Sequence, residues 1–180
     1  FAVFLAGGVG SHGPVAGEQG FAGTERMGRE LAARLSKQLA QTPLTNSITL
    51  GILAVDVGLP QLNERVTDSI RLRPWLTRQL LPAAHDSFVQ GFRLQNSIWI
   101  STPCDYSGEL ALGIKDMLRA RGFSGVVTSF NGDYIGYVIP SRYFHMSGYE
   151  PRIMSFYGPY VPDYIDELAR TIALDLTALN

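Results

Sequence analysis

Side chains capable of chemistry are concentrated in three short segments of the sequence. These segments are Gly8-Val-Gly-Ser-His-Gly-Pro14, Thr102-Pro-Cys-Asp-Tyr-Ser-Gly-Glu109 and Asn131-Gly-Asp-Tyr-Ile-Gly-Tyr-Val138. Each follows a run of apolar residues that predicts a strand. Because ligands of α/β proteins bind beyond the carboxyl ends of strands, these segments are the first candidates for a functional site.

The first segment offers a hydroxyl group on Ser11 and an imidazole on His12. No GxSxG elbow frames them, and neither GxGxxG nor GxxxxGK[ST] is present to predict a phosphate-binding loop. Adjacent residues rarely point toward each other, so the residues alone favour an ordinary turn over a nucleophilic pair.

The second segment places Asp105 after a predicted strand and before a predicted helix. Asp105 could cap that helix, because a carboxylate accepts the free amides of the first turn, or it could serve in catalysis. Glu109 comes four residues later and would share a helix face with Asp105. Cys104, with no base beside it, is expected to be a packed small residue.

The third segment carries Tyr134 and Tyr137, which are three residues apart. Aromatic residues favour strands, so packing in a strand is their simplest role. In a regular strand the two rings would point to opposite faces, and at most one would face a given site. The histidines, His12, His85 and His145, show no HxH or HExxH spacing, so the residues alone define no complete zinc site.

Alternating strands and helices are expected to position these segments. Apolar runs predict strands at 2–6, 47–56, 125–130 and 134–139, and a hairpin over 89–102 with its turn near Gln95-Asn96. Spacings of three and four predict helices at 24–41, capped by Thr24, at 106–120 and at 162–178, with a less regular excursion over 61–86. The fold class is therefore α/β, with a mixed sheet flanked by helices.

Composition narrows the class of protein. The 180 residues carry a net charge of −1, which gives no electrostatic reason to expect nucleic acid as a partner. A single cysteine excludes an internal disulfide framework. No apolar run reaches the roughly 18 residues that a spanning helix needs. The sequence opens inside an apolar run, so we expect the N-terminal part of the domain to be missing and the fold to be incomplete.

Taken together and in order, the three segments resemble motifs of the neutral, non-lysosomal ceramidases and their bacterial relatives. The first resembles the family's Asn-x-Gly-Asp-x-Ser-Pro, and Ile100-Ser-Thr-Pro-Cys-Asp-Tyr-Ser107 resembles its strand followed by Pro-Gly-Glu-Phe-Thr. Asn131–Val138 is similar to its Asn-x-Tyr-x-x-Tyr-Val strand. Tyr149-Glu150 and Tyr157-Gly-Pro159 match further landmarks. By this resemblance, residues 1–180 form the C-terminal portion of one ceramidase-like catalytic domain.

The resemblance implies zinc as the cofactor. The family's metal-binding glutamate corresponds to Asp105 and its metal-side tyrosine to Tyr137 or Tyr134, with Tyr137 preferred and Glu109 in reserve. Aspartate is one methylene shorter than glutamate but keeps an oxygen donor. The family's metal histidines come from earlier in the chain than the matching region.

The family's nucleophilic serine falls at Gly13 and its aspartate at Ser11. Three alternatives stay open: Ser11 or His12 acts in a shifted geometry, zinc activates water to attack directly, or the activity is lost. The expected function is zinc-dependent hydrolysis of an N-acyl amide bond, in ceramide or a related lipid. The rivals are a non-catalytic relative that binds a lipid or glycan, and an esterase or carbohydrate-directed hydrolase.

The resemblance also implies where the protein works and on what. The expected partner is a small-molecule or lipid amide substrate, with room for peripheral contact with a membrane and no nucleic acid. The expected location is secreted, periplasmic or membrane-associated. The sequence does not define an oligomeric state.

Overall fold

The computed structural model describes residues 3–15, 17, 19–44, 46–81, 84 and 86–179. The chain forms two compact units. The larger comprises Phe1–His12 with Thr49–Asn180, and the smaller comprises Gly13–Ile48. The second and third of the segments singled out above lie in the larger unit, as does the first except for its last two residues, Gly13 and Pro14.

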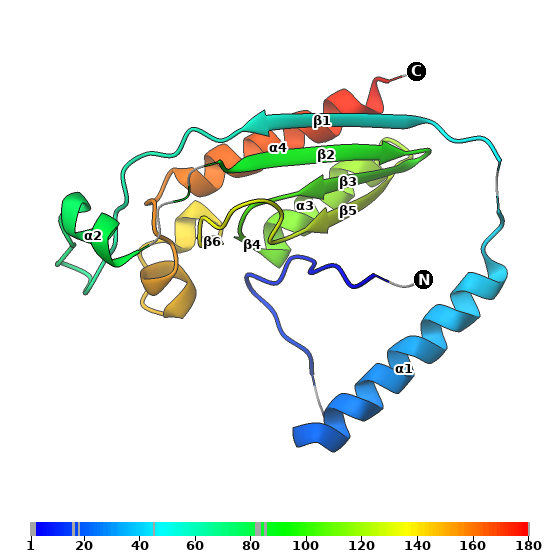
Figure 1. Ribbon diagram of the computed structural model, residues 1–180, viewed down its shortest axis with the longest axis horizontal. Helices are drawn as coiled ribbons and strands as arrows, with labels where there is room; N and C mark the ends of the chain where they lie inside the picture. Colours follow the sequence, from blue (N-terminus) through cyan, green and yellow to red (C-terminus); the bar gives the residue numbers. More distant parts are fainter. Residues whose placement is uncertain are drawn as a thin grey trace. The chain divides into compact units, whose positions relative to one another are not determined.

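The larger unit is built on a four-stranded sheet in the order β1-β2-β3-β5. β1 (Leu50–Asp56), β2 (Phe88–Leu94) and β3 (Ser97–Ser101) are antiparallel, and β5 (Ser124–Thr128) runs parallel to β3. The predicted hairpin is confirmed, with Gln95 in its turn at a φ of 57°. The predicted mixed sheet is thus confirmed (Figure 1).

Helices α3 (Gly108–Arg119) and α4 (Val161–Thr177) pack on this sheet, α3 against β5 and α4 against β1, β2 and β3. Gly91 of β2 lets α4 approach closely, because a Cβ there would lie 2.5 Å from Ile172. Both predicted helices are confirmed, and their apolar faces join the sheet in one core.

A short second sheet holds the candidate site. It pairs β4 (Asp105–Tyr106) with β6 (Tyr137–Val138) in parallel, so that Asp105 lies opposite Tyr137. The excursion predicted at 61–86 contains helix α2 (Pro74–Leu80). Two short helical turns, η1 (Ser141–Tyr143) and η2 (Tyr149–Ile153), follow β6.

The strand predicted at 2–6 is wrong over its described residues, 3–6, which are irregular. Only its end contacts the sheet: the amide of Ser129, just past β5, donates to the carbonyl of Ala6 at 2.9 Å. Val3 and Phe4 are 63% and 86% exposed. Their apolar surface is not buried, so little stabilises an extended pairing here.

The smaller unit is dominated by helix α1 (Gly20–Gln41). The helix was predicted, but Thr24 does not cap it: α1 begins at Gly20, and the Thr24 hydroxyl donates to the Gly20 carbonyl at 3.3 Å. The leucines that suggested an amphipathic helix, Leu31, Leu35 and Leu39, are 54–73% exposed. No helix among the described residues is long and apolar enough to span a membrane.

Candidate functional site

The first two segments meet through backbone contacts. The Gly10 amide donates to the carbonyl of Tyr106 at 3.0 Å, and Val9 forms a bridge with Ser107. The approach requires glycine, because a Cβ at Gly10 would lie 2.4 Å from the carbonyl oxygen of Asp105. Glycine at this position therefore lets the first segment lie directly against β4.

The third segment joins the same strand from its other side. The Asp105 amide donates to the carbonyl of Gly136 at 3.0 Å, and the Ser107 amide donates to that of Val138 at 2.9 Å. All three segments therefore converge on β4, although the first of them does not follow the strand that was predicted before it.

Asp105 is the central carboxyl group of this convergence. Its side chain is 6% exposed, and Oδ2 accepts a 2.6 Å hydrogen bond from the hydroxyl of Tyr134. Burial raises the pKa of Asp105, and the hydrogen bond from Tyr134 opposes that rise. No ion pair with Asp105 occurs in the described part of the chain. Its negative charge, when present, has no cation beside it.

Tyr134 and Tyr137 both lie close to Asp105, so the expectation that they face opposite sides is wrong. The strand predicted at 134–139 is wrong except at Tyr137–Val138, so Tyr134 lies outside β6, and Gly136 between the two tyrosines has a φ of +84°, which no regular strand allows. Burial and the charge of Asp105 raise the pKa of both tyrosines. Both phenols consequently stay protonated near neutrality and can donate hydrogen bonds.

Two further aromatic rings pack against these tyrosines. Tyr149 meets Tyr137 edge to face with centroids 5.8 Å apart, and Phe156 meets Tyr134 in the same way at 6.4 Å. Both geometries are favourable for aromatic pairs. The landmark Tyr149-Glu150 of the sequence thus lies beside the candidate site, where Glu150 also raises the pKa of Tyr137.

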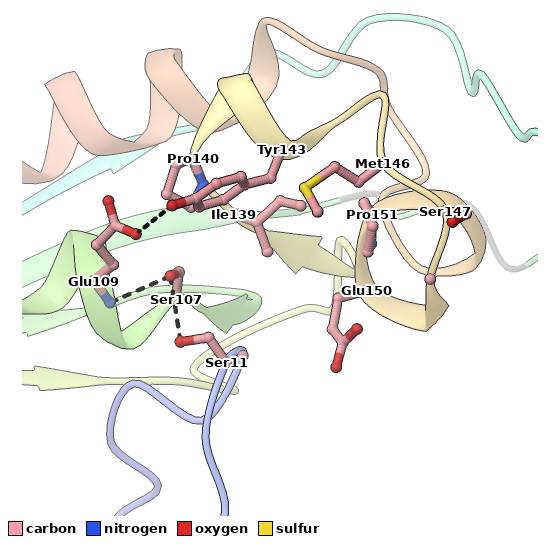
Figure 2. A pocket seen from close by; sticks show the side chains of 12 residues that line it. Ser11, Ser107, Glu109, Ile139, Pro140, Tyr143, Met146, Ser147, Glu150 and Pro151 are labelled. Carbon is pink, nitrogen blue, oxygen red and sulfur yellow. Dashed lines mark hydrogen bonds between the residues drawn. The ribbon is translucent and has the colours of Figure 1, made fainter. Parts of the chain in front are cut away.

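Ser11 lies at the start of α3. Its Oγ accepts a 2.9 Å hydrogen bond from the amide of Gly108. The Ser107 hydroxyl also donates to it, at 3.4 Å (Figure 2). His12 is exposed and its ring lies over Gly108, where a Cβ would come within 2.7 Å of Nδ1. No hydrogen bond joins Ser11 to His12 among the described contacts, so the two do not form a nucleophile and base pair in this structure.

A cavity of about 330 Å³ opens beside Ser11. Figure 2 shows Ser11 and Ser107 on one wall, with the segment after β6 on the other. Carboxylates flank it: Glu109 pairs with Arg142 and accepts from the Tyr143 hydroxyl at 3.3 Å, and Glu150 lies across from Ser11. The remaining lining residues are Gly10, Ile139, Pro140, Met146, Ser147, Gly148 and Pro151.

Asp105 is not the helix cap that the residues alone allowed. It lies in β4, and Ser107 is the N-cap of α3, accepting a hydrogen bond from the Glu109 amide at 3.3 Å. Asp105 and Glu109 therefore share no helix face, and Glu109, the reserve metal ligand, is instead paired with Arg142.

Sequence reasoning missed Ser107 and Tyr143. The Ser107-Gly-Glu109 pattern carried the signal for a cap, since serine just before an acidic first turn is typical of a helix start. Tyr143 carried no such signal, because η1 alone directs it into the cavity. Cys104 is fully buried, and burial raises the pKa of its thiol to about 12, so it is packed and protonated.

The donor set for a metal is partial. Asp105, Tyr134 and Tyr137 provide oxygen donors, but no group of three or more histidine, cysteine, aspartate or glutamate side chains occurs among the described residues. Neither His12 nor His145 is near enough to Asp105 to form an ion pair with it, and His85 lies outside the described residues.

Comparison with known proteins gives structural matches only. No model of a protein family matches the sequence, and no curated protein matches it. The structure is similar to that of neutral ceramidase from Pseudomonas aeruginosa, with a TM-score of 0.60 and 17% identity, over 89% of this chain and 34% of that one. It also matches a structure of ceramidase complexed with C2, with a TM-score of 0.44 and 19% identity, over 50% and 15% of the two chains.

The chain thus spans about a third of the length of the Pseudomonas enzyme. At this level of identity the match concerns the fold. The predicted resemblance is confirmed at that level: this chain has the fold of part of a neutral ceramidase.

Proposed function

We propose that this chain is part of a zinc-dependent hydrolase that cleaves an N-acyl amide bond, in ceramide or a related lipid. The observation that carries the proposal is the buried Asp105, which accepts a hydrogen bond from Tyr134. Neither residue lines the cavity beside Ser11. A buried carboxylate without a cation is costly, and a metal ion would offset that cost. The fold shared with neutral ceramidase agrees with this chemistry.

Zinc fits the oxygen donors at this site in part. Carboxylate oxygen is an ordinary zinc ligand, and structural or catalytic sites need three or four ligands in total. Asp105 and one of Tyr134 or Tyr137 would hold one side of the ion, and the remaining ligands would come from other residues. When bound, zinc would polarise the amide carbonyl and activate the attacking water.

One of the two tyrosines would stabilise the negative charge that develops on the carbonyl oxygen. Their raised pKa keeps both phenols neutral, so each retains a proton to donate. Preorganised donors of this kind contribute about 2.7–4 kcal/mol per group in acyl transfer. Because Tyr134 donates its hydroxyl proton to Asp105, Tyr137, whose hydroxyl donates to no group among the described hydrogen bonds, would be that donor.

Ser11 would orient the substrate rather than attack it. Its Oγ is engaged by the Gly108 amide, and the structure supports no base for it among its hydrogen-bond partners. The family's serine position, Gly13, has no side chain to contribute. Attack by water is therefore the route that these residues favour over a covalent intermediate on serine.

A second candidate function is binding without catalysis. Glycine at the family's serine position, Gly13, and the lack of a base beside Ser11 favour it, because a relative that has lost its nucleophile would have both features. Such a protein would bind a lipid or glycan in the cavity beside Ser11. An esterase or carbohydrate-directed hydrolase is the remaining alternative, and a panel of amide and ester substrates separates it from the first.

Elemental analysis of the full-length parent protein, which would supply the remaining zinc ligands, tests the proposal before a substrate is chosen. We expect near-stoichiometric zinc, which should be lost in Asp105→Ala. It should be kept in the control Asp116→Ala, which changes an exposed aspartate of α3. A protein that holds zinc would then be assayed on N-acyl amides. Absence of zinc from both the native protein and the control would refute the hydrolase and leave the binding function.

A further inference from the structure

A second cavity lies away from the candidate site, with a volume of about 910 Å³. Three stretches form it: 60–63, 71–74 and 157–161, with His145 beside them. The first two belong to the irregular excursion between β1 and β2, and none of its lining residues belongs to the cavity beside Ser11.

The side chains of this groove that can carry a charge are all basic. Arg71, Arg73 and His145 line it, and no aspartate or glutamate is among its described lining residues. Arg71 donates only to the side chain of Asn63, at 3.3 Å, and neither Arg71 nor Arg73 forms an ion pair within the described chain. Six other arginines, Arg26, Arg29, Arg119, Arg142, Arg152 and Arg170, are each paired with a carboxylate, whereas Arg34, Arg65, Arg78, Arg93 and Arg121 form no ion pair within the described chain either.

A buried arginine adds to the positive charge behind this groove. Arg65 is 5% exposed, and its guanidinium donates to the carbonyls of Phe144 and Pro151 instead of to a carboxylate. Burial and the nearby charge of Arg71 lower the pKa of Arg65, although Asp68 and Glu64 act in the opposite direction. Asp68 is itself paired with Arg152 at 3.4 Å. The net local charge is positive although the whole chain carries −1.

The walls of the groove are apolar and aromatic. Leu62 and Val161 are buried at its base, while Tyr157 is half-buried and Tyr160, 82% exposed, stands at the rim. A smaller cavity of about 220 Å³ shares Leu62 and Tyr157 with it and adds another arginine, Arg78. A ligand here would meet guanidinium groups and ring faces together.

We propose that this groove binds the phosphate of an organic phosphate whose remaining part is apolar or aromatic. Two guanidinium groups and an imidazole match the several oxygens and the double charge of a phosphate monoester better than the single charge of a carboxylate. Leu62, Tyr157 and Tyr160 would contact the apolar part. The site is independent of the proposed hydrolase function.

Phenyl phosphate, titrated calorimetrically, is the probe. We expect saturable binding that added salt weakens, and at least about tenfold weaker binding in the double variant Arg71→Gln/Arg73→Gln, because two charge-assisted contacts are lost. Arg119→Gln/Arg121→Gln is the matched control: it removes the same charge at the same spacing from the end of α3 and should bind as the native protein does. Equal unfolding temperatures of both double variants would show that neither change disrupts the fold.

Two further ligands identify the source of the phosphate. Vesicles of phosphatidylcholine with phosphatidic acid are the second ligand. If the vesicles bind through Arg71 and Arg73 and phenyl phosphate does not bind, the phosphate belongs to a lipid headgroup. If phenyl phosphate binds and the vesicles do not, the phosphate belongs to a soluble ligand. Binding of phenol as tight as that of phenyl phosphate would overturn the proposal, as would equal affinity of the native protein and Arg71→Gln/Arg73→Gln. Zinc content, measured on the same samples, reports separately on the hydrolase.

Discussion

Burial raises the pKa of two carboxyl groups, those of Asp105 and Glu64, but their surroundings differ. Asp105 accepts a hydrogen bond from Tyr134, whereas Oε2 of Glu64 is buried and has no hydrogen-bond partner among the described residues. A buried polar atom without a partner costs free energy, so the two residues should respond differently to substitution and to pH.

Replacing Tyr134 by phenylalanine should raise the pKa of Asp105 further, because the hydrogen bond that stabilises its charged form is lost. The loss should also cost about 1–3 kcal/mol of stability at a pH where Asp105 is ionised. NMR titration of the Asp105 carboxyl carbon and chemical denaturation measure the two effects. Tyr164→Phe, in α4, is the control, and an unchanged pKa of Asp105 in Tyr134→Phe would contradict the hydrogen bond.

Glu64 should make the protein less stable as the pH rises from about 4.5 to 7. Burial raises its pKa from 4.5 to about 7, so in this window the folded state binds more protons than the unfolded state. Stability then falls with increasing pH, and below about 4.5 the difference vanishes.

Glu64→Gln should remove that dependence, so its gain in unfolding temperature over the native protein should grow between pH 4.5 and 7. Thermal melts across this range measure it, with Glu25→Gln, an exposed residue of α1, as the control. A constant difference between native protein and Glu64→Gln at every pH would show that Glu64 does not titrate in this window.

At the scale of elements, the site depends on how closely the first segment approaches β4. Gly10→Ala should displace the loop that carries Ser11, because its Cβ would meet backbone atoms of Asp105 at 2.4 Å and no flexible side chain can yield there. Gly13→Ala is the matched control, since nothing lies within 4 Å of a Cβ at that position.

We expect Gly10→Ala to lower the unfolding free energy by about 1–3 kcal/mol, as other overpacking changes do, and Gly13→Ala to leave it within about 0.5 kcal/mol. Zinc content or ligand binding should fall in Gly10→Ala alone. Equal stability of the two variants would mean that the loop does not rest on β4.

At the scale of the whole molecule, the two units differ in how their helices are stabilised. Helix α4 buries seven residues in the core, from Val161 to Leu176, whereas Gly23 is the one buried residue of α1. Most of the stability of a helix in a protein comes from packing of its apolar face, so α1 lacks the main source of stability that α4 has.

Hydrogen exchange should therefore separate the two helices in this chain. Amides of Val161–Thr177 should exchange at the rate of global unfolding, and those of Gly20–Gln41 should exchange much faster. Mass spectrometry of peptic fragments measures both in one experiment. Equal protection of the two helices would show that α1 has a packing partner, such as a second copy of the chain.

The sequence by itself determined most of the elements. Apolar periodicity located α3, α4 and the β2–β3 hairpin to within a few residues, because these elements bury one face and their patterns record it. It also singled out Asp105, Tyr134 and Tyr137, which the structure places beside one another, and their role in a site stays a prediction.

Only the tertiary structure decided how those residues meet. Gly136 ends the alternation that would have separated Tyr134 from Tyr137, and a positive φ cannot be read from a glycine alone. The arginines of the groove, Arg71 and Arg73, carry no periodic signal, and their lack of carboxylate partners depends on contacts between residues far apart in the chain. Local patterns record burial, whereas charge balance and close approach arise only when distant segments pack together.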